Sequence, residues 1–169
     1  MGLILVRIYD SYDTAAKRAE TAAQVLKDTE MTDSFTGNEA TAIRVNYGNI
    51  LGNGDNNDAL VTVSFGPENN IMAVYRKNGD SYEYAGTVGY FYGVDNISIE
   101  KLADRPDVII FRERNNQSIG AREKSGFIRG YMYQNGKFEN VLNIDENIES
   151  WFSSTDNGKT SWDKVEQTS

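Results

Sequence analysis

Short stretches rich in β-forming residues, separated by turn residues, constrain this chain more than any other feature. They lie at 42–47, 59–65, 71–76, 81–88, 97–102, 108–112, 127–133 and 138–144. Two of the intervening turns contain Asn-Gly, at Asn78-Gly79 and Asn135-Gly136. Asn-Gly is typical of tight hairpins, because both central positions of a type I′ turn need a positive φ. Many short strands joined by such turns predict an antiparallel meander.

One helix is predicted before the strands. Small and apolar residues recur there at the spacing i, i+3, i+4 and i+7, which predicts an amphipathic helix over residues 12–28. Asp10, Ser11 and Asp13 are the candidate N-terminal caps. Most of the apolar stripe is alanine, so the helix can approach its neighbour closely. We expect it to lie across a sheet.

These patterns together predict an α+β fold. In it, the N-terminal amphipathic helix packs on a mainly antiparallel β-meander that is sandwich-like or curled into a partial barrel. We expect residues 1–169 to form a single domain, with a strand-rich body over about 41–145 and a short helix and loose tail over about 146–169. A chain of this length can bury a sizeable core without disulfides.

A weak internal repeat runs through the strand-rich body. Residues 55–61 resemble residues 104–110, and each segment is followed by a second β-rich stretch and an Asn-Gly hairpin. The repeating unit has roughly fifty residues, which corresponds to one four-stranded sheet per copy. The alternative is that any meander with Asp-led strands produces such a match.

The composition restricts the chemistry that the chain can perform. It contains no histidine and no cysteine, which excludes Ser-His-Asp triads, thiol nucleophiles, disulfides and thiolate metal sites. Hydrolysis by a pair of carboxylates remains, although the sequence locates no such pair. With 17 basic and 25 acidic residues, the net charge of −8 disfavours nucleic acid as a partner. No stretch has the apolar length of a transmembrane segment.

The loop at 53–58 is the best local candidate for a metal site. Asn53, Asp55, Asn57 and Asp58 place four oxygen-bearing side chains on a glycine-containing turn, as a calcium ion requires. The pattern departs from an EF-hand loop, because Asp58 occupies the glycine position and Ser64 the position of the bidentate glutamate. Calcium is therefore one hypothesis for this loop, and a plain polar hairpin loop is the other.

Three consecutive aromatic residues, Tyr90, Phe91 and Tyr92, are a candidate ligand-binding site. Successive residues of a strand point to opposite faces, so at least one of the three should be exposed or cover an edge. An exposed ring could stack on a sugar or contact a protein. Packing in the core is the alternative.

Arg112 and Arg114 are a candidate interaction site. They alternate with Glu113, so the two arginines share one face of the predicted strand and could meet an acidic partner. The alternative is a solvated face paired with Glu113 and Glu123, an arrangement that also suits an edge strand guarded by charge against aggregation.

Because the chemistries that need histidine or cysteine are excluded, the sequence favours a non-enzymatic binding or interaction domain with an unknown protein or glycan partner. A carboxylate-dependent glycan hydrolase and a small acidic intracellular inhibitor of a basic partner are the alternatives. An extracytoplasmic location, with a signal segment removed, is favoured over a cytoplasmic one by the Asn- and Tyr-rich composition and the hairpin turns.

Overall fold

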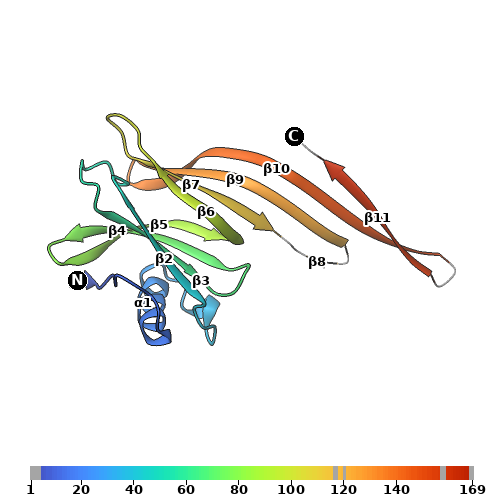
Figure 1. Cartoon of the computed structure of the whole chain (residues 1–169), viewed down its shortest axis with the longest axis horizontal. Coiled ribbons are helices and arrows are strands. Elements are labelled where there is room, and N and C mark those ends of the chain that lie inside the picture. The colour runs from blue at the N-terminus through green and yellow to red at the C-terminus, as the bar shows by residue number, and fades with distance from the viewer. Residues whose placement is uncertain (1–4, 116–117, 120, 157–158, 168–169) are drawn as a thin grey trace.

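The computed structural model describes the backbone of residues 5–115, 118–119, 121–156 and 159–167, and the side chains of residues 7–115 and 125–146. The body has three layers: one helix, a first antiparallel sheet and a second antiparallel sheet (Figure 1). The two sheets form an open sandwich and do not close into a barrel. This arrangement confirms the predicted α+β class, with a helix on a mainly antiparallel meander.

The first sheet has the strand order β1-β5-β4-β3-β2, with every pair antiparallel. Its strands are β1 (Leu5–Val6), β2 (Ala42–Gly48), β3 (Asp58–Ser64), β4 (Asn70–Asn78) and β5 (Ser81–Phe91). The second sheet has the order β11-β10-β9-β7-β6, and β8 pairs with β9. Its strands are β6 (Gly93–Glu100), β7 (Val108–Asn115), β8 (Ser118–Ile119), β9 (Ala121–Gln134), β10 (Lys137–Asp156) and β11 (Lys159–Gln167).

The two Asn-Gly sites both form hairpins, but with different turns. Asn135 and Gly136 have φ of +52° and +82° and connect β9 to β10, as a type I′ turn requires. In the β4–β5 hairpin, Asn78 is still a paired strand residue, and the loop is Gly79-Asp80 with a positive φ at Gly79. That pattern is typical of type II′, so the prediction of a type I′ turn is wrong for this hairpin.

Helix α1 (Ala15–Asp28) starts later than predicted and has a different cap. The side chain of Thr14 accepts a hydrogen bond from the amide of Lys17 at 3.3 Å, so Thr14 is the N-cap. The candidate caps Asp10, Ser11 and Asp13 are therefore wrong. A single turn of 3-10 helix, η1 (Asp33–Phe35), follows. Among the described residues, no helix combines the length and hydropathy needed to cross a membrane.

Two hydrophobic cores hold the three layers together. Val25 and Leu26 of α1 pack with Val61, Val63 and other residues of the first sheet. A second core lies between the sheets, and its members include Leu60, Met72, Val74, Ile109 and Phe111. Because the first sheet is covered on both faces, every residue of β3 is buried rather than every second one.

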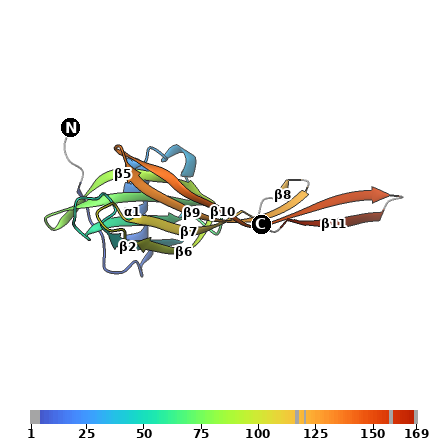
Figure 2. The ribbon, with the colours of Figure 1, turned by 90° about the horizontal axis from the view of Figure 1, so that it is seen from above.

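The C-terminal residues form strands, so the predicted short helix and loose tail over 146–169 are wrong where the backbone is described. Residues 147–156 continue β10, and residues 159–167 form β11. Together with residues 121–124 of β9 they extend away from the body, and we call these three segments the arm (Figure 2). The apolar spacing over 146–152 suits either a helix or a strand, and pairing on both sides of β10 selects the strand.

Each unit of the predicted repeat folds as one four-stranded meander: β2 to β5 in the first sheet, and β6, β7, β9 and β10 in the second. The pairing also corresponds position by position. Residues 55–61 correspond to 104–110, so Leu60 corresponds to Ile109; Leu60 pairs with Val74, and Ile109 pairs with Tyr131. Leu60, Val74 and Ile109 all belong to the core between the sheets, so equivalent faces of the two sheets meet there.

Candidate functional site

The residues of strand β7 alternate between the two faces of the second sheet. Ile109 and Phe111 belong to the core between the sheets. The alternate residues Ile110, Arg112 and Arg114 therefore lie on the opposite side, which we call the outer face. The predicted placement of the two arginines on one face is confirmed. The edge-strand interpretation is wrong, because β7 lies between β6 and β9.

Strand register extends the outer face into two rows of mainly apolar residues. The rows are Ile110–Gly130–Leu142 and Arg112–Ile128–Ile144. A Cβ on Gly130 would lie 2.7 Å from the Cβ of Leu142, so glycine lets the leucine lie across the middle of its row. Ile144 is 46% exposed, and the other apolar side chains are half-buried. No described element covers this face (Figure 1).

Charged residues flank the apolar rows in balanced pairs. The Nε of Arg112 donates to Oε2 of Glu146, and Nη2 of Arg114 lies 2.8 Å from Oδ2 of Asp95. Such partly exposed pairs contribute only about 0–1 kcal/mol each. Their main consequence is that two positive and two negative charges cancel on the outer face.

The sequence prediction missed the apolar residues of the outer face. Leu142 and Ile144 alternate along one strand, and Val108, Ile109 and Ile110 are apolar on both faces of another. This pattern is visible in the sequence, but side chains that point into a core would produce it equally well. Only the register of β7, β9 and β10 shows which of these residues lie outside.

The opposite face carries a buried ion pair where the chain crosses from the first sheet to the second. Nε of Arg129 lies 2.9 Å from Oε2 of Glu113, whose side chain is almost fully buried. Oε1 of Glu113 accepts a hydrogen bond from the amide of Tyr92 at 3.1 Å, and Arg129 also donates to Asn143. The Tyr92 carbonyl accepts from Asn70 at 2.5 Å. These bonds fix the β5–β6 crossover.

The structure does not bring Tyr90, Phe91 and Tyr92 to one surface. Phe91 is buried between the sheets, with its ring centroid 4.7 Å from that of Phe111. Tyr90 is exposed, and its hydroxyl donates to Asn69, which confirms that at least one of the three is exposed. The Tyr90 and Tyr92 rings lie 6.2 Å apart, so two of the three rings are neighbours.

Two side chains of the proposed calcium loop accept hydrogen bonds from nearby backbone amides. Oδ2 of Asp58 accepts from the amide of Leu51 at 2.8 Å, and Oδ1 of Asn53 accepts from the amide of Asp55 at 3.2 Å. Asp55 and Asn57 are exposed, whereas Asp58 is buried, and burial raises the pKa of its carboxyl. Among the described residues, no three acidic groups lie together as a metal site. Calcium binding here stays a prediction.

The repeat provides a second aspartate, Asp107, that accepts a backbone hydrogen bond as Asp58 does. Oδ2 of Asp107 accepts from the amide of Asn49 at 2.8 Å, and the amide of Asp107 donates to the Asn49 carbonyl at 2.9 Å. Asp58 precedes the core residues of β3, and Asp107 directly precedes β7. The two aspartates therefore bind the same connector, residues 49–51, and join the starts of strands in both sheets.

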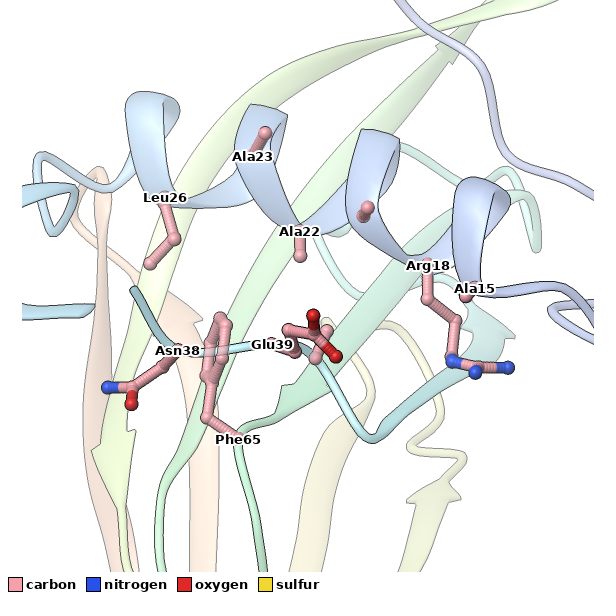
Figure 3. A pocket seen from close by; sticks show the side chains of 10 residues that line it. Ala15, Arg18, Ala22, Ala23, Leu26, Asn38, Glu39 and Phe65 are labelled. Carbon is pink, nitrogen blue, oxygen red and sulfur yellow. The ribbon is translucent and has the colours of Figure 1, made fainter. Parts of the chain in front are cut away.

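A shallow groove lies between α1 and the segment before β2 (Figure 3). Ala15, Ala19 and Ala23, which are exposed, form part of its wall, and Phe65 lies across from the helix. Its charged residues are Arg18 and Glu39. The cavity volume is about 260 Å³, below the ~300–1,000 Å³ of most ligand pockets. We therefore regard the outer face as the stronger candidate.

A second hollow, about 380 Å³ in volume, contains two carboxylates, Glu68 and Asp95. Asp95 is paired with Arg114, and Glu68 is exposed. One of the two carboxylates is therefore already engaged by an arginine, which gives little support to a site that hydrolyses glycans with two carboxylates.

No protein-family model, no curated protein and no solved structure matches this chain.

Proposed function

We propose that this chain is a non-enzymatic binding domain whose binding surface is the outer face of the second sheet. The observation that supports the proposal is the pair of uncovered apolar rows, with Ile144 nearly half exposed at the end of one. Covering apolar area is favourable by about 25 cal/mol per Å². Contiguous uncovered apolar surface on a folded domain is typical of interaction sites.

The rows favour a protein as the partner over a glycan. Sugars are bound by exposed aromatic rings and polar groups, whereas Ile110, Ile128, Leu142 and Ile144 are aliphatic. The rows also lie on hydrogen-bonded strands rather than on a loop, so little order has to be gained on binding. The extracytoplasmic location stays a prediction from the sequence.

The carboxylates of the described region give little support to the hydrolase alternative. Glu113 is buried against Arg129, and Glu146 is paired with Arg112. The groove beside α1 is lined by a single carboxylate, Glu39, whereas glycoside hydrolysis requires two.

The proposal can be tested with a dye that becomes fluorescent on apolar surfaces, 1-anilinonaphthalene-8-sulfonate, at high protein dilution. We expect the folded wild type to enhance its emission and Ile144→Lys to remove most of that enhancement. Tyr47→Lys is the matched control, because Tyr47 is a similarly exposed apolar residue of β2, in the other sheet. No enhancement by the wild type, or equal losses in both variants, would contradict the proposal.

A further inference from the structure

We infer that the outer face binds an amphipathic helix of another protein, in the way that the first sheet binds α1. The inference rests on the proposed function and names the kind of partner. It depends on the internal repeat, on the short connection between the two sheets and on the dimensions of the outer face.

The repeat identifies the face of the first sheet that corresponds to the outer face. Residues 55–61 correspond to 104–110, so Val61 corresponds to Ile110. Val61 belongs to the core under α1, together with Val25 of that helix. The outer face of the second sheet is therefore equivalent to the face of the first sheet that a helix covers (Figure 1).

Strand register extends this correspondence beyond a single residue. Under α1, Val61 pairs with Ala73, and on the outer face Ile110 pairs with Gly130. In both sheets a β-branched residue thus lies beside a small one. The next row corresponds in the same way, with Val63–Ile71 under α1 and Arg112–Ile128 on the outer face. The equivalence therefore holds for two adjacent rows.

The second sheet has no helix of its own at the equivalent place. Helix α1 precedes β2, the first strand of the first repeat unit. Strand β6, the first strand of the second unit, follows β5 after Tyr92 alone. One residue cannot form a helix. Because α1 of any other copy is packed on its own first sheet, the described part of a second copy offers no free helix either. The helix must therefore come from another protein.

The dimensions of the outer face suit one helix. Four strands spaced about 4.8 Å apart give a width of roughly 19 Å. A helix as long as α1, which has 14 residues, extends about 21 Å and so spans all four strands. The two rows are two residues apart, or about 6.6 Å along the strands. A helix with its side chains is about 10–12 Å wide, so one helix covers both rows.

Charge on the outer face indicates how the helix is recognised. Arg112 occupies a position that is apolar in the first sheet, but its charge is paired with that of Glu146. Arg114 is paired with Asp95 in the same way. Because these four charges cancel, the partner helix is recognised by its apolar stripe rather than by its net charge. The stripe should carry small and aliphatic residues at helical spacing, as Ala22, Val25 and Leu26 do in α1.

A peptide with the sequence of α1, residues 14–29, is the probe that tests the inference. A hydrocarbon link between positions 16 and 20, which are exposed in α1, keeps so short a peptide helical. The fluorescence anisotropy of the labelled peptide is measured as the full chain is added. We expect saturable binding with a Kd below about 1 mM. Raising the salt concentration from about 0.05 M to about 0.5 M should change this Kd little, because net charge does not drive the contact.

Matched variants locate the contact on both partners. Val25→Lys in the peptide and Ile144→Lys in the full chain should each weaken binding at least about fivefold, because each places a charge in the apolar contact. Tyr47→Lys in the full chain should bind the peptide like the wild type. Urea unfolding confirms that each variant of the chain is folded. If Ile144→Lys does not fold, Ile144→Ser replaces it and should weaken binding in the same direction.

A wild type that does not bind the peptide would overturn the inference. So would binding that persists in the folded Ile144 variant, since the peptide would then lie elsewhere, or binding that Val25→Lys leaves unchanged. Sedimentation velocity of the chain alone tests another occupant. A mass that rises with concentration in the wild type but not in the Ile144 variant would assign the outer face to a second copy and overturn the helix.

The proposed function fails separately. An outer face that binds the dye but not the peptide would leave that proposal standing and overturn only the inferred helix. A chain that binds neither the dye nor the peptide would contradict both.

Discussion

Individual side chains in the core between α1 and the first sheet make specific polar contacts as well as apolar ones. Tyr75 is fully buried, and its hydroxyl donates a hydrogen bond to Oδ2 of Asp28 at 3.0 Å. Tyr75→Phe keeps the ring and removes this bond to a charged group, so we expect a loss of about 1–2 kcal/mol in the free energy of unfolding. Urea unfolding at pH 7 measures the change. Tyr47→Phe, at a half-exposed ring, should change stability by less than about 0.5 kcal/mol, and equal effects would contradict this interpretation.

The same tyrosine should make stability sensitive to alkaline pH. Burial, followed by the nearby carboxylate of Asp28, raises the pKa of Tyr75 far above its ordinary value of 10.0. Above about pH 10 the Tyr75 hydroxyl of the unfolded chain loses its proton, whereas the folded chain keeps it. Stability is therefore fully present below about pH 10 and decreases as the pH rises. The slope for one such group is at most about 1.4 kcal/mol per pH unit.

Urea midpoints are measured between about pH 8 and about pH 11, which extends from about two units below to about one unit above the ordinary tyrosine pKa. They should decrease for the wild type and decrease less for Tyr75→Phe. Tyr47 should contribute a smaller part, because burial and the neighbouring Tyr82 raise its pKa to about 12 but its ring is half exposed. A pH profile that is the same in wild type and Tyr75→Phe would show that Tyr75 does not cause the effect.

Strands and helices differed in how far the sequence could place them. The strands from 42 to 144 were predictable because turn residues separate them, although residues 121–126 and the end of β10 were missed. The helix was predictable from its spacing, but its buried face was not. Thr21 and Val25 face the sheet, while several stripe alanines are exposed. Alanine costs little to expose, so the larger Val25 and Leu26 decide which side is buried.

For the candidate site, alternation was enough to place Arg112 and Arg114 on one face. It could not show that Ile128 and Ile144 lie beside Arg112, because that contact depends on the register of three strands and on two irregularities in the β9–β10 pairing. Register is set by distant residues, and a shift by one position reverses every side chain.

The connector between β2 and β3 should depend on aspartates from both sheets. Asp58→Ala leaves the buried amide of Leu51 without its acceptor, and we expect a loss of about 1–3 kcal/mol. Asp58→Asn keeps an acceptor oxygen and removes a carboxylate whose charged form burial disfavours, as its raised pKa indicates. It should therefore cost clearly less at pH 7. Thermal and urea unfolding compare the two variants. Equal losses would contradict the interpretation that Asp58 acts as a hydrogen-bond acceptor for which a neutral oxygen suffices.

The arm should unfold before the body. In it, β10 pairs with β9 on one side and with β11 on the other, and within the described residues β11 pairs with β10 alone. Short ribbons of this kind are marginally stable without a core. Both tryptophans of the chain, Trp151 and Trp162, belong to β10 and β11 of the arm. Tryptophan emission should therefore change at a lower urea concentration than the near-ultraviolet circular dichroism of the tyrosines. Coincident transitions would show that arm and body unfold together.

The body as a whole should behave as one cooperative unit, because β3 contributes to both cores. Leu60 belongs to the core between the sheets, and its neighbours Ala59 and Val61 belong to the core under α1. A loss on one side of β3 therefore weakens the strand to which the other side is attached. The two sheets are also joined through connector 49–51, which Asp58 and Asp107 hold together.

Leu60→Ala tests this coupling over the full thickness of the molecule. The substitution leaves a cavity between the sheets and should lower the free energy of unfolding by about 2–5 kcal/mol. If the body is one unit, hydrogen exchange of the slowest amides should accelerate by the same factor in α1, which Leu60 does not contact as a core neighbour, as in β7. Val141→Ala, at an exposed side chain, should leave both rates unchanged. Acceleration confined to β7 would show that the helix layer and the second sheet are stabilised independently, each through its own face of β3.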